Sequence, residues 1–433
     1  MMVNSVWSEK LACCTESIRV AVAQIGARRN YAVPVAFQRE GLLVRFYTDF
    51  YAPKSLFGAS VRCFARFLPL PVLRRAAARS GAEISPEIVV HFPSFALAYK
   101  LQKQIAARQG TLPRAYVWGG KRFCELIIKH GFPKVEVFYC FSSAAQEIFS
   151  NLEGSSVQRV LDQGIPPLRF DQHLVREQEL AYPDWTARPT QWGAVEEYTE
   201  RQRKEWELAD IILCPSRFCE RALVSEAAPL SKIRIVPFGI HERFFAIEPS
   251  RDSRSTLRVL FVGNTPIRKG LPDLVLALKK LDSRFIEAVF VGEPAGLSKW
   301  GYREATKVGR FLGSVPRADM PKLYQSADVL VLPTVSDVFP AVVLEAMAAG
   351  LPVITTPNCG SSDAVRDGVD GFIVPVRSPE EIAARLELLA KDRALLLEMG
   401  RNAAEQARNY TLLAYQQRLI NLIRKELNSK RDS

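Results

Sequence analysis

Long uninterrupted apolar runs are missing from this sequence of 433 residues. No segment reaches the roughly 18 charge-free apolar residues that span a membrane, and the N-terminus lacks an apolar core followed by a small-residue cleavage site. Histidine is scarce, with four residues, and none of the eight cysteines belongs to a CxxC pair or to a Cys/His array spaced for zinc. We therefore expect a cytoplasmic protein with reduced thiols, no bound metal and no membrane-spanning segment.

The charge is unbalanced towards the basic side. Lys and Arg number 58 against 46 acidic residues, which gives a formal net charge of +12. Such a balance is typical of proteins that meet polyanions, phosphates or an anionic membrane, although a merely solvated basic surface explains it equally well. The basic residues are dispersed and no nucleic-acid recognition motif is present, so we expect no nucleic-acid partner.

One basic stretch also contains many apolar residues. Residues 56–79, LFGASVRCFARFLPLPVLRRAAAR, combine Phe and Leu with five arginines. Such a surface can lie on anionic headgroups as a peripheral contact at the inner face of a membrane. A core-facing pair of helices, interrupted by Pro69 and Pro71, is an equally good interpretation.

Strand-like and helix-like patterns alternate along the chain, which predicts an α/β fold. With 48% hydrophobic residues, the chain is long enough for two domains. Short apolar runs that predict parallel strands lie at 18–26, 87–92, 135–141 and 157–162 in the first half, and at 257–263, 287–292, 328–333 and 351–356 in the second. We therefore predict two doubly wound parallel sheets.

The domain boundary is predicted from a polar stretch. Residues 249–256, PSRDSRST, begin no regular element and resemble a linker. We predict a first domain over residues 1–250 and a second over 251–411. The last helix-like segment, about 412–433, has no strand after it, so we expect it to cross back and pack on the first domain.

Two carboxylates flank the start of a predicted helix in VSDVFPAVVLEAMAAG. Asp337 and Glu345 stand on either side of Pro340, which suits a first helical turn. Ligands of parallel sheets gather at the carboxyl ends of strands, where the amides of Ala341 to Val343 can meet a phosphate. Acids beside a phosphate site are useful when sugar hydroxyls donate to them. A nucleotide sugar has this layout.

A second loop offers cations. GNTPIRKG, residues 263–270, follows a predicted strand and contains Arg268 and Lys269 side by side. Cations at a strand end can neutralise a departing diphosphate without a metal. Alone, each loop is weak evidence, because Lys-Gly pairs are common and Asp337 is explained as a helix cap. Together, the two loops predict one site on one face of a sheet.

The segments FVGNTPIRKG, ADVLVLPTVSDVFPAVVLEAMAAGLPVITT and DAVRDGVDGFIVP resemble glycosyltransferases of family 4, which have the GT-B fold of two Rossmann-like domains facing across a cleft. The resemblance covers most of residues 195–410. It implies retaining transfer of a sugar from a nucleotide-diphosphate sugar to a glycan, lipid-linked or small-molecule acceptor. The second domain would hold the donor and the first the acceptor, with no cofactor or metal.

The resemblance also implies roles for residues at the donor. Lys269 is expected to neutralise the diphosphate, Asp337 to contact the donor sugar and Glu345 to bind the ribose. The backbone of Phe339, Pro340, Ala341, Val342 and Val343 is expected to hold sugar and phosphate oxygens.

Two positions near the start of the second domain complete the expected donor site. Gly263 and Asn264 end the first strand of that domain, and Asn264 stands where the family usually has an arginine. Arg268 can supply that charge instead, and we count it with Lys269 among the catalytic candidates.

The first domain resembles the family only loosely. Asp162 stands near the position of a histidine that family members often place at a strand end, so we predict it as a cleft residue. Gly26 allows close backbone approach, and Arg28 or Arg29 can meet a phosphate or an anionic acceptor, although two solvated arginines explain the pattern too. His91 is a weaker candidate because it directly follows a buried strand.

Two other functional classes stay open. A nucleotide-sugar-binding or regulatory subunit of a polysaccharide assembly, with weak or no catalysis, is favoured by Asn264 and by the missing histidine. A Rossmann dehydrogenase is disfavoured because no strand is followed by GxGxxG and an acid about 20 residues later.

Overall fold

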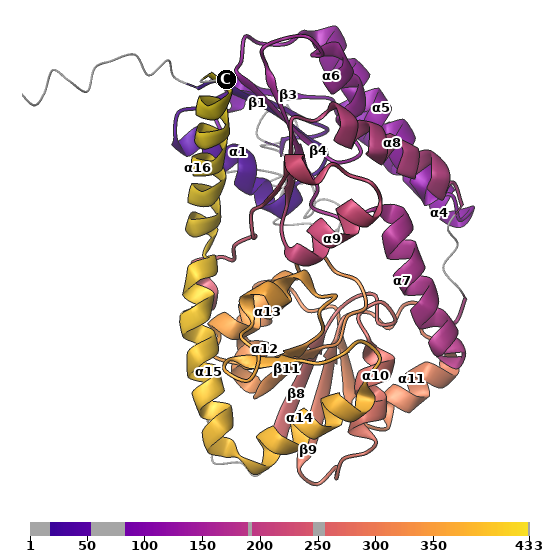
Figure 1. Cartoon of the computed structure of the whole chain (residues 1–433). Helices are drawn as coiled ribbons and strands as arrows, with labels where there is room; N and C mark the ends of the chain where they lie inside the picture. Colours follow the sequence, from indigo (N-terminus) through magenta and orange to yellow (C-terminus); the bar gives the residue numbers. More distant parts are fainter. Residues whose placement is uncertain (1–17, 53–82, 189–192, 246–255, 432–433) are drawn as a thin grey trace, which may run out of the picture.

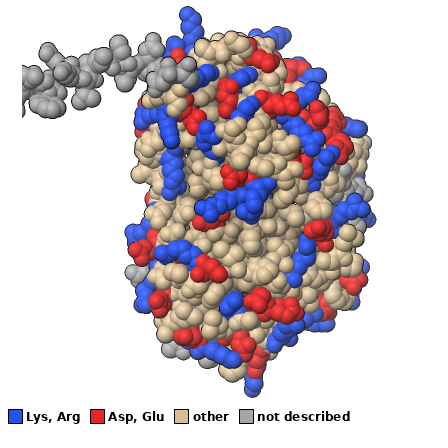
Figure 2. Space-filling view, in the orientation of Figure 1, with Lys and Arg blue, Asp and Glu red and all other residues tan. Residues whose placement is uncertain are grey.

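The computed structural model describes residues 18–52, 83–188, 193–245 and 256–431, which form two α/β halves stacked along the long axis of the molecule (Figure 1). The basic stretch 56–79 and the predicted boundary at residue 250 lie outside the described residues. Lys and Arg side chains gather across the middle of one face, where the two halves meet (Figure 2). Within the described part of the chain, no helix combines the length and the apolar character needed to cross a bilayer.

The first half is a seven-stranded parallel sheet of order β3-β2-β1-β4-β5-β6-β7, with helices packed around it. Its strands are β1 (Val20–Gln24), β2 (Leu43–Thr48), β3 (Val89–His91), β4 (Val137–Phe141), β5 (Gln158–Asp162), β6 (Ile211–Cys214) and β7 (Ile233–Ile235). Its helices are α1 (Ala32–Arg39), α4 (Pro93–Arg108), α5 (Leu112–His130), α6 (Gln146–Asn151), α7 (Leu168–Ala181), α8 (Val195–Leu208) and α9 (Arg217–Ser225). The central strands are buried on both faces, which explains their continuous apolar sequences.

The second half is a six-stranded parallel sheet of order β10-β9-β8-β11-β12-β13. Its strands are β8 (Leu257–Val262), β9 (Ile286–Val291), β10 (Arg310–Gly313), β11 (Val329–Leu332), β12 (Val353–Thr355) and β13 (Gly371–Ile373). Its helices are α10 (Leu271–Leu278), α11 (Lys299–Thr306), α12 (Met320–Ser326), α13 (Ala341–Ala348), α14 (Pro379–Lys391) and α15 (Arg393–Ala407).

Both sheets reverse their strand order at one point. The chain passes outward from β1 to β3 and then returns to place β4 beside β1; β8, β10 and β11 repeat this pattern. At such a reversal point, the connections that follow the two strands run in opposite directions, and ligands of parallel sheets bind there. The loops after β8 and β11 therefore lie at the reversal point of the second sheet, and the loops after β1 and β4 at that of the first.

The last helix, α16 (Leu412–Arg431), joins the core of the first half, as predicted. It runs beside α1 (Figure 1). Tyr415, Leu419 and Ile423 are buried there, and the Gln416 amide donates to the carbonyl oxygen of Ala32 at 3.1 Å. The chain thus passes from the first half to the second and back again.

Polar contacts also join the halves away from α16. The Tyr182 hydroxyl and the Gln178 amide donate to the buried carboxylate of Asp273, at 2.5 and 2.8 Å. The Ser216 hydroxyl donates to the carbonyl oxygen of Val338 at 2.7 Å. These contacts from the ends of α7 and α9 hold the second half in one orientation.

Replacing Leu419 by Ala tests the place of α16 in the core. We expect Leu419→Ala to lower the free energy of unfolding by about 2–4 kcal/mol, because the fully buried side chain leaves a cavity. Leu413→Ala is the control, since Leu413 lies on the same helix but is 60% exposed, and it should cost less than about 0.5 kcal/mol. Urea denaturation, monitored by circular dichroism, measures the free energy of unfolding of both variants. Equal losses would contradict a core role for α16.

Candidate active site

The loops after β8 and β11 lie side by side at the reversal point of the second sheet. The carbonyl oxygen of Arg268 accepts hydrogen bonds from the Val335 amide (2.9 Å) and the Thr334 hydroxyl (3.0 Å). Gly270 has a φ of +76°, and a Cβ there would lie 1.9 Å from the carbonyl oxygen of Pro333. This close approach of the two loops therefore requires glycine.

Lys269 and Asp337 face each other across these loops as an ion pair between Nζ and a carboxylate oxygen. Their side chains are only 14% and 16% exposed. Burial, followed by the charge of Arg268, lowers the pKa of Lys269 to about 8, while Cys359 and Asp171 act in the opposite direction. The loops thus hold a lysine that is charged at neutral pH and titrates just above it.

Arg268 points away from this pair towards the first half. Its Nε donates to the carbonyl oxygen of Ser336 at 2.8 Å and lies 3.3 Å from a carboxylate oxygen of Asp171 on α7. The Ser336 hydroxyl donates to the same carboxylate. Arg268 therefore joins the two halves beside a small cavity of about 280 Å³. Its predicted role at a diphosphate stays a prediction, and its observed partner is a carboxylate.

The two neighbouring positions at the end of β8 have clear local roles. A Cβ at Gly263 would lie 2.9 Å from Cγ of Lys269, so the glycine gives the lysine side chain room to cross the strand end. Asn264 Oδ1 accepts from the Glu293 amide at 3.3 Å and so fixes the loop after β9. The asparagine therefore supports the loop framework without adding charge.

The start of α13 differs slightly from the predicted turn. Pro340 has extended ψ (115°) and directly precedes the helix, so it is not its first residue. Its carbonyl oxygen accepts from the Val343 amide (3.2 Å) and the Ser361 hydroxyl (3.0 Å). The Val343 amide is therefore already engaged. Ala341 and Val342 are the first two residues of the helix, and Ala341 lines the interdomain cavity.

Around this turn, Asp337 and Glu345 occupy different depths. Asp337 Oδ1 accepts from the Phe339 amide at 3.3 Å, which orients its carboxylate at the mouth of the helix. Glu345 is 5% exposed and accepts from the Tyr324 hydroxyl at 2.9 Å. Burial raises the pKa of Glu345, while the bond from Tyr324 and the charge of Arg317 act in the opposite direction. Glu345 is thus a firmly positioned acceptor.

On the first half, the loop after β1 has an unusual backbone. Arg29, Asn30 and Tyr31 all have positive φ, at 49°, 52° and 63°. Three consecutive non-glycine residues in this region cost free energy and are kept where the surroundings fix them. Gly26, also at positive φ, donates its amide to Asp49 Oδ1 at 2.8 Å, which ties the loop to the end of β2.

Arg29 is held in an aromatic cage. Its guanidinium lies 4.1 Å from the ring centroid of Phe238 and 5.4 Å from those of Phe141 and Tyr415, and it pairs with Asp162. Burial opposes the charge of Arg29, but Asp162, Tyr415 and Tyr139 together outweigh this effect and the pKa of Arg29 is raised. The charge of this arginine is thus already balanced within the protein.

The remaining candidates of the first half lie farther from the interdomain cavity or deeper in the fold than a ligand-contacting residue would. Asp162 is 3% exposed beneath Arg29 and accepts from the Tyr139 hydroxyl at 2.5 Å, so it positions Arg29 and does not itself open to the cleft. Arg28 lies over the ring of Phe141 at 5.4 Å. His91 sits on the edge strand β3, where Nδ1 accepts from the Tyr51 amide at 3.4 Å. Among the described residues, the interdomain cavity is lined by neither His91 nor Asp162.

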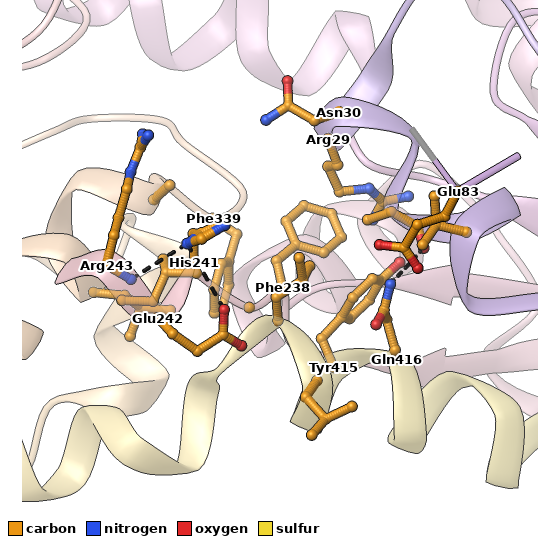
Figure 3. A pocket seen from close by; sticks show the side chains of 18 of the residues that line it. Arg29, Asn30, Glu83, Phe238, His241, Glu242, Arg243, Phe339, Tyr415 and Gln416 are labelled. Carbon is orange, nitrogen blue, oxygen red and sulfur yellow. Dashed lines mark hydrogen bonds and ion pairs between the residues drawn. The ribbon is translucent and has the colours of Figure 1, made fainter. Parts of the chain in front are cut away.

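A cavity of about 640 Å³ lies between the halves, where α16 crosses. The described residues that line it include Arg29, Asn30, Arg39 and Glu83 from the first half, Phe238, His241 and Arg243 from the connecting segment, Arg317, Phe339, Ala341 and Leu344 from the second, and Tyr415 and Gln416 from α16. Phe238 lies between Arg29 and Phe339, with its ring 5.5 Å from that of Phe339 (Figure 3). One wall therefore runs without a break across both halves.

The sequence relationships agree with this geometry. Residues 245–408 match the family described as glycosyl transferases group 1. The D-inositol 3-phosphate glycosyltransferase of Kribbella flavida is 35% identical over 205 residues, which are 42% of this chain and 48% of that protein. The chain spans about half the length of the curated relatives it matches.

Solved structures with the GT-B fold share the whole arrangement. Sucrose-phosphate synthase of Thermosynechococcus elongatus superposes with a TM-score of 0.65 at 18% identity, covering 95% of this chain and 100% of that one. HepE of Anabaena, solved with UDP-glucose, gives 0.57 at 15% identity, covering 94% and 100%. At such identities the likeness shows the fold alone, and the predicted GT-B fold is confirmed.

Four residues around the GT-B cleft were not predicted from the sequence. Tyr324 and Arg317 approach Glu345 from α12 and from the loop after β10, with Arg317 3.7 Å from its carboxylate. Phe238 and Arg243 come from the segment that connects the halves. The only sequence signal for Arg317 is its place just after a strand, in GSVPR.

The caged ion pair gives a stability prediction. Asp162→Asn should lower the free energy of unfolding by about 3 kcal/mol, because it leaves Arg29 buried without a countercharge. Asp210→Asn is the control: Asp210 pairs with Arg159 at the other end of β5 and is 29% exposed, so we expect a loss of about 1 kcal/mol. Thermal and urea unfolding measure both. A smaller loss for Asp162→Asn than for the control would refute the cage.

Proposed function

We propose that this chain transfers a sugar, with retention of anomeric configuration, from a nucleotide-diphosphate sugar to a hydroxyl acceptor bound in the interdomain cleft. The observation that supports this proposal best is the Lys269–Asp337 pair at the reversal point, with Glu345 set deeper on α13. HepE, which has the same fold, was solved with UDP and with UDP-glucose, so UDP-glucose is the first donor to test.

Donor binding would exchange one anion for another. An incoming diphosphate takes the place of Asp337 as the partner of Lys269, and the released carboxylate then accepts from hydroxyls of the donor sugar. The amides of Ala341 and Val342, at the start of α13, add partial positive charge at the phosphates. Glu345, fixed by Tyr324, accepts from the ribose hydroxyls.

The transfer step needs stabilisation of the leaving group more than a protein nucleophile. The bond from the anomeric carbon to the diphosphate breaks while the acceptor hydroxyl forms the new glycosidic bond on the same face, and the leaving phosphate oxygen takes the acceptor proton. Glu345 stays held by Tyr324, and Asp337, once the diphosphate has released it from Lys269, turns to the sugar hydroxyls. Lys269 would then supply the main electrostatic stabilisation.

The acceptor would lie on the first half. We propose a glycan, a lipid-linked sugar or a small molecule, with Asn30 and Arg243 among the polar side chains that face it. We further propose that transfer takes place in the cytoplasm, next to an anionic membrane, and that Lys269 acts where other transferases use a metal ion.

A donor screen tests the function itself. The full chain is incubated with a panel of nucleotide sugars, and thermal stabilisation and slow donor hydrolysis are measured with and without EDTA. We expect one donor to raise the melting temperature by several degrees and to be hydrolysed at the same rate in EDTA. Stabilisation without hydrolysis, or without transfer to any acceptor, would instead support a regulatory nucleotide-sugar-binding subunit.

Removing the lysine tests the proposed mechanism. Lys269→Ala should lower kcat by about 10²–10³-fold, because stabilisation of the departing diphosphate is lost, and should change acceptor KM much less. The matched control is Lys279→Ala, which removes a lysine that also pairs with a carboxylate, Glu304, on the same domain. Unchanged kcat in Lys269→Ala would exclude this mechanism.

The lowered pKa of Lys269 predicts a pH dependence. Because the free enzyme loses the lysine charge as the pH rises through about 8, kcat/KM for the donor should fall above that pH. In Lys269→Arg the cation persists, so this alkaline limb should disappear even if the rate is lower. Measuring kcat/KM for the donor from about pH 6 to pH 10, in both the unmodified chain and Lys269→Arg, tests this prediction. A limb that survives in Lys269→Arg belongs to another group.

A further inference from the structure

Helix α4 presents an apolar ridge on the outside of the first half. Leu97, Leu101 and Ile105 follow one another at intervals of four residues and are 72%, 57% and 42% exposed. This spacing places the three side chains along one side of the helix. We call these three residues the α4 ridge. α4 lies at the outer edge of the first half beside α5 (Figure 1).

The opposite side of α4 is firmly packed. Phe95 stacks on Tyr99 (5.5 Å between ring centroids) and on Phe123 of α5 (5.7 Å). Gly119 of α5 makes room for Tyr99, because a Cβ there would lie 2.3 Å from its ring. The aromatic layer therefore fixes the rotation of α4, and the α4 ridge is turned outward by the fold.

The segment that contains the α4 ridge is basic, although Arg114 pairs with Glu197 and Arg122 with Glu125. Residues 88–124 contain no Asp or Glu but six basic residues, Lys100, Lys103, Arg108, Arg114, Lys121 and Arg122. Arg108 follows Leu97 by eleven residues, close to three full turns, so it continues the ridge; Lys100 borders it. Within the described part of the chain, neither Lys100 nor Arg108 forms an ion pair.

We propose that the α4 ridge docks on an anionic lipid bilayer. Its three apolar side chains enter the boundary between headgroups and acyl chains, while Lys100 and Arg108 meet lipid phosphates. A bilayer suits this surface better than an acidic protein does, because the ridge is a single row of exposed aliphatic side chains on one helix. The proposal gives the membrane contact a location outside residues 56–79.

The position of α4 connects this docking to the cleft. α4 starts directly after β3, at the carboxyl ends of the strands, and the loop after β1 reaches the cavity from these same ends. A bilayer on the α4 ridge therefore lies beside the half assigned to the acceptor, which favours an acceptor held in that membrane. This last consequence rests on the proposed function, whereas the docking itself does not.

Vesicle sedimentation of the full chain, without any donor, tests the docking. Vesicles of phosphatidylcholine are compared with vesicles that contain about 30% phosphatidylglycerol. We expect the anionic vesicles to bind at least about tenfold more protein, and Leu97→Glu/Leu101→Glu to lose about tenfold of that binding. The control is Leu230→Glu, because Leu230 is 60% exposed and precedes β7, at the sheet edge opposite β3. It should bind as the unmodified protein does.

Two further measurements keep the outcomes distinct. Lys100→Gln/Arg108→Gln keeps the apolar residues and should also weaken binding to anionic vesicles, by about threefold or more. Donor hydrolysis by all these variants should equal that of the unmodified chain. If neither the unmodified chain nor any variant hydrolyses a donor, the proposed function is refuted but the docking proposal is not. Equal recovery from both vesicle types, or full binding by the Leu97→Glu/Leu101→Glu variant, would overturn the docking proposal.

Discussion

A lysine buried beside a carboxylate at the end of β8 is the constraint around which the second half is organised. Burial, followed by the charge of Arg268, lowers the pKa of Lys269 to about 8 from a usual value near 10.5. Glycines at 263 and 270 allow the approach of backbone and side chain that creates this burial. A ligand with two phosphates offers more negative charge than Asp337 alone, so the same burial that weakens the free cation strengthens its response to such a ligand.

Arg29 shows the opposite use of a buried cation. It stands at the end of β1 as Lys269 stands at the end of β8, but its charge is balanced by Asp162 and covered by aromatic rings. The strained loop around it costs about 1–3 kcal/mol per residue, which the cage and the ion pair must offset. Among the described residues, Lys269 pairs with one carboxylate, that of Asp337, whereas Arg29 is also enclosed by aromatic rings and shapes a wall of the cavity.

The sequence predicts the framework of this protein better than its side-chain partners. Apolar runs in 257–263 and 135–141 predict strands because central parallel strands are buried on both faces, and β8 and β4 confirm them. The rule that ligands meet strand ends also brings Lys269 and Asp337 together correctly. Arg268 turns to Asp171 and Asp162 lies beneath Arg29 because partners distant in the sequence decide these contacts, and no local pattern records them.

The contact between Arg268 and Asp171 links the orientation of the two halves to the lysine next to it. Asp171 belongs to α7 of the first half, and Arg268 is the residue before Lys269, with its carbonyl oxygen bonded to the loop after β11. Asp171 thus provides, from the other half, the carboxylate that restrains Arg268 and its loop. The contact with the first half therefore restrains the loop that positions Lys269, so the placement of this cation beside Asp337 depends on both halves.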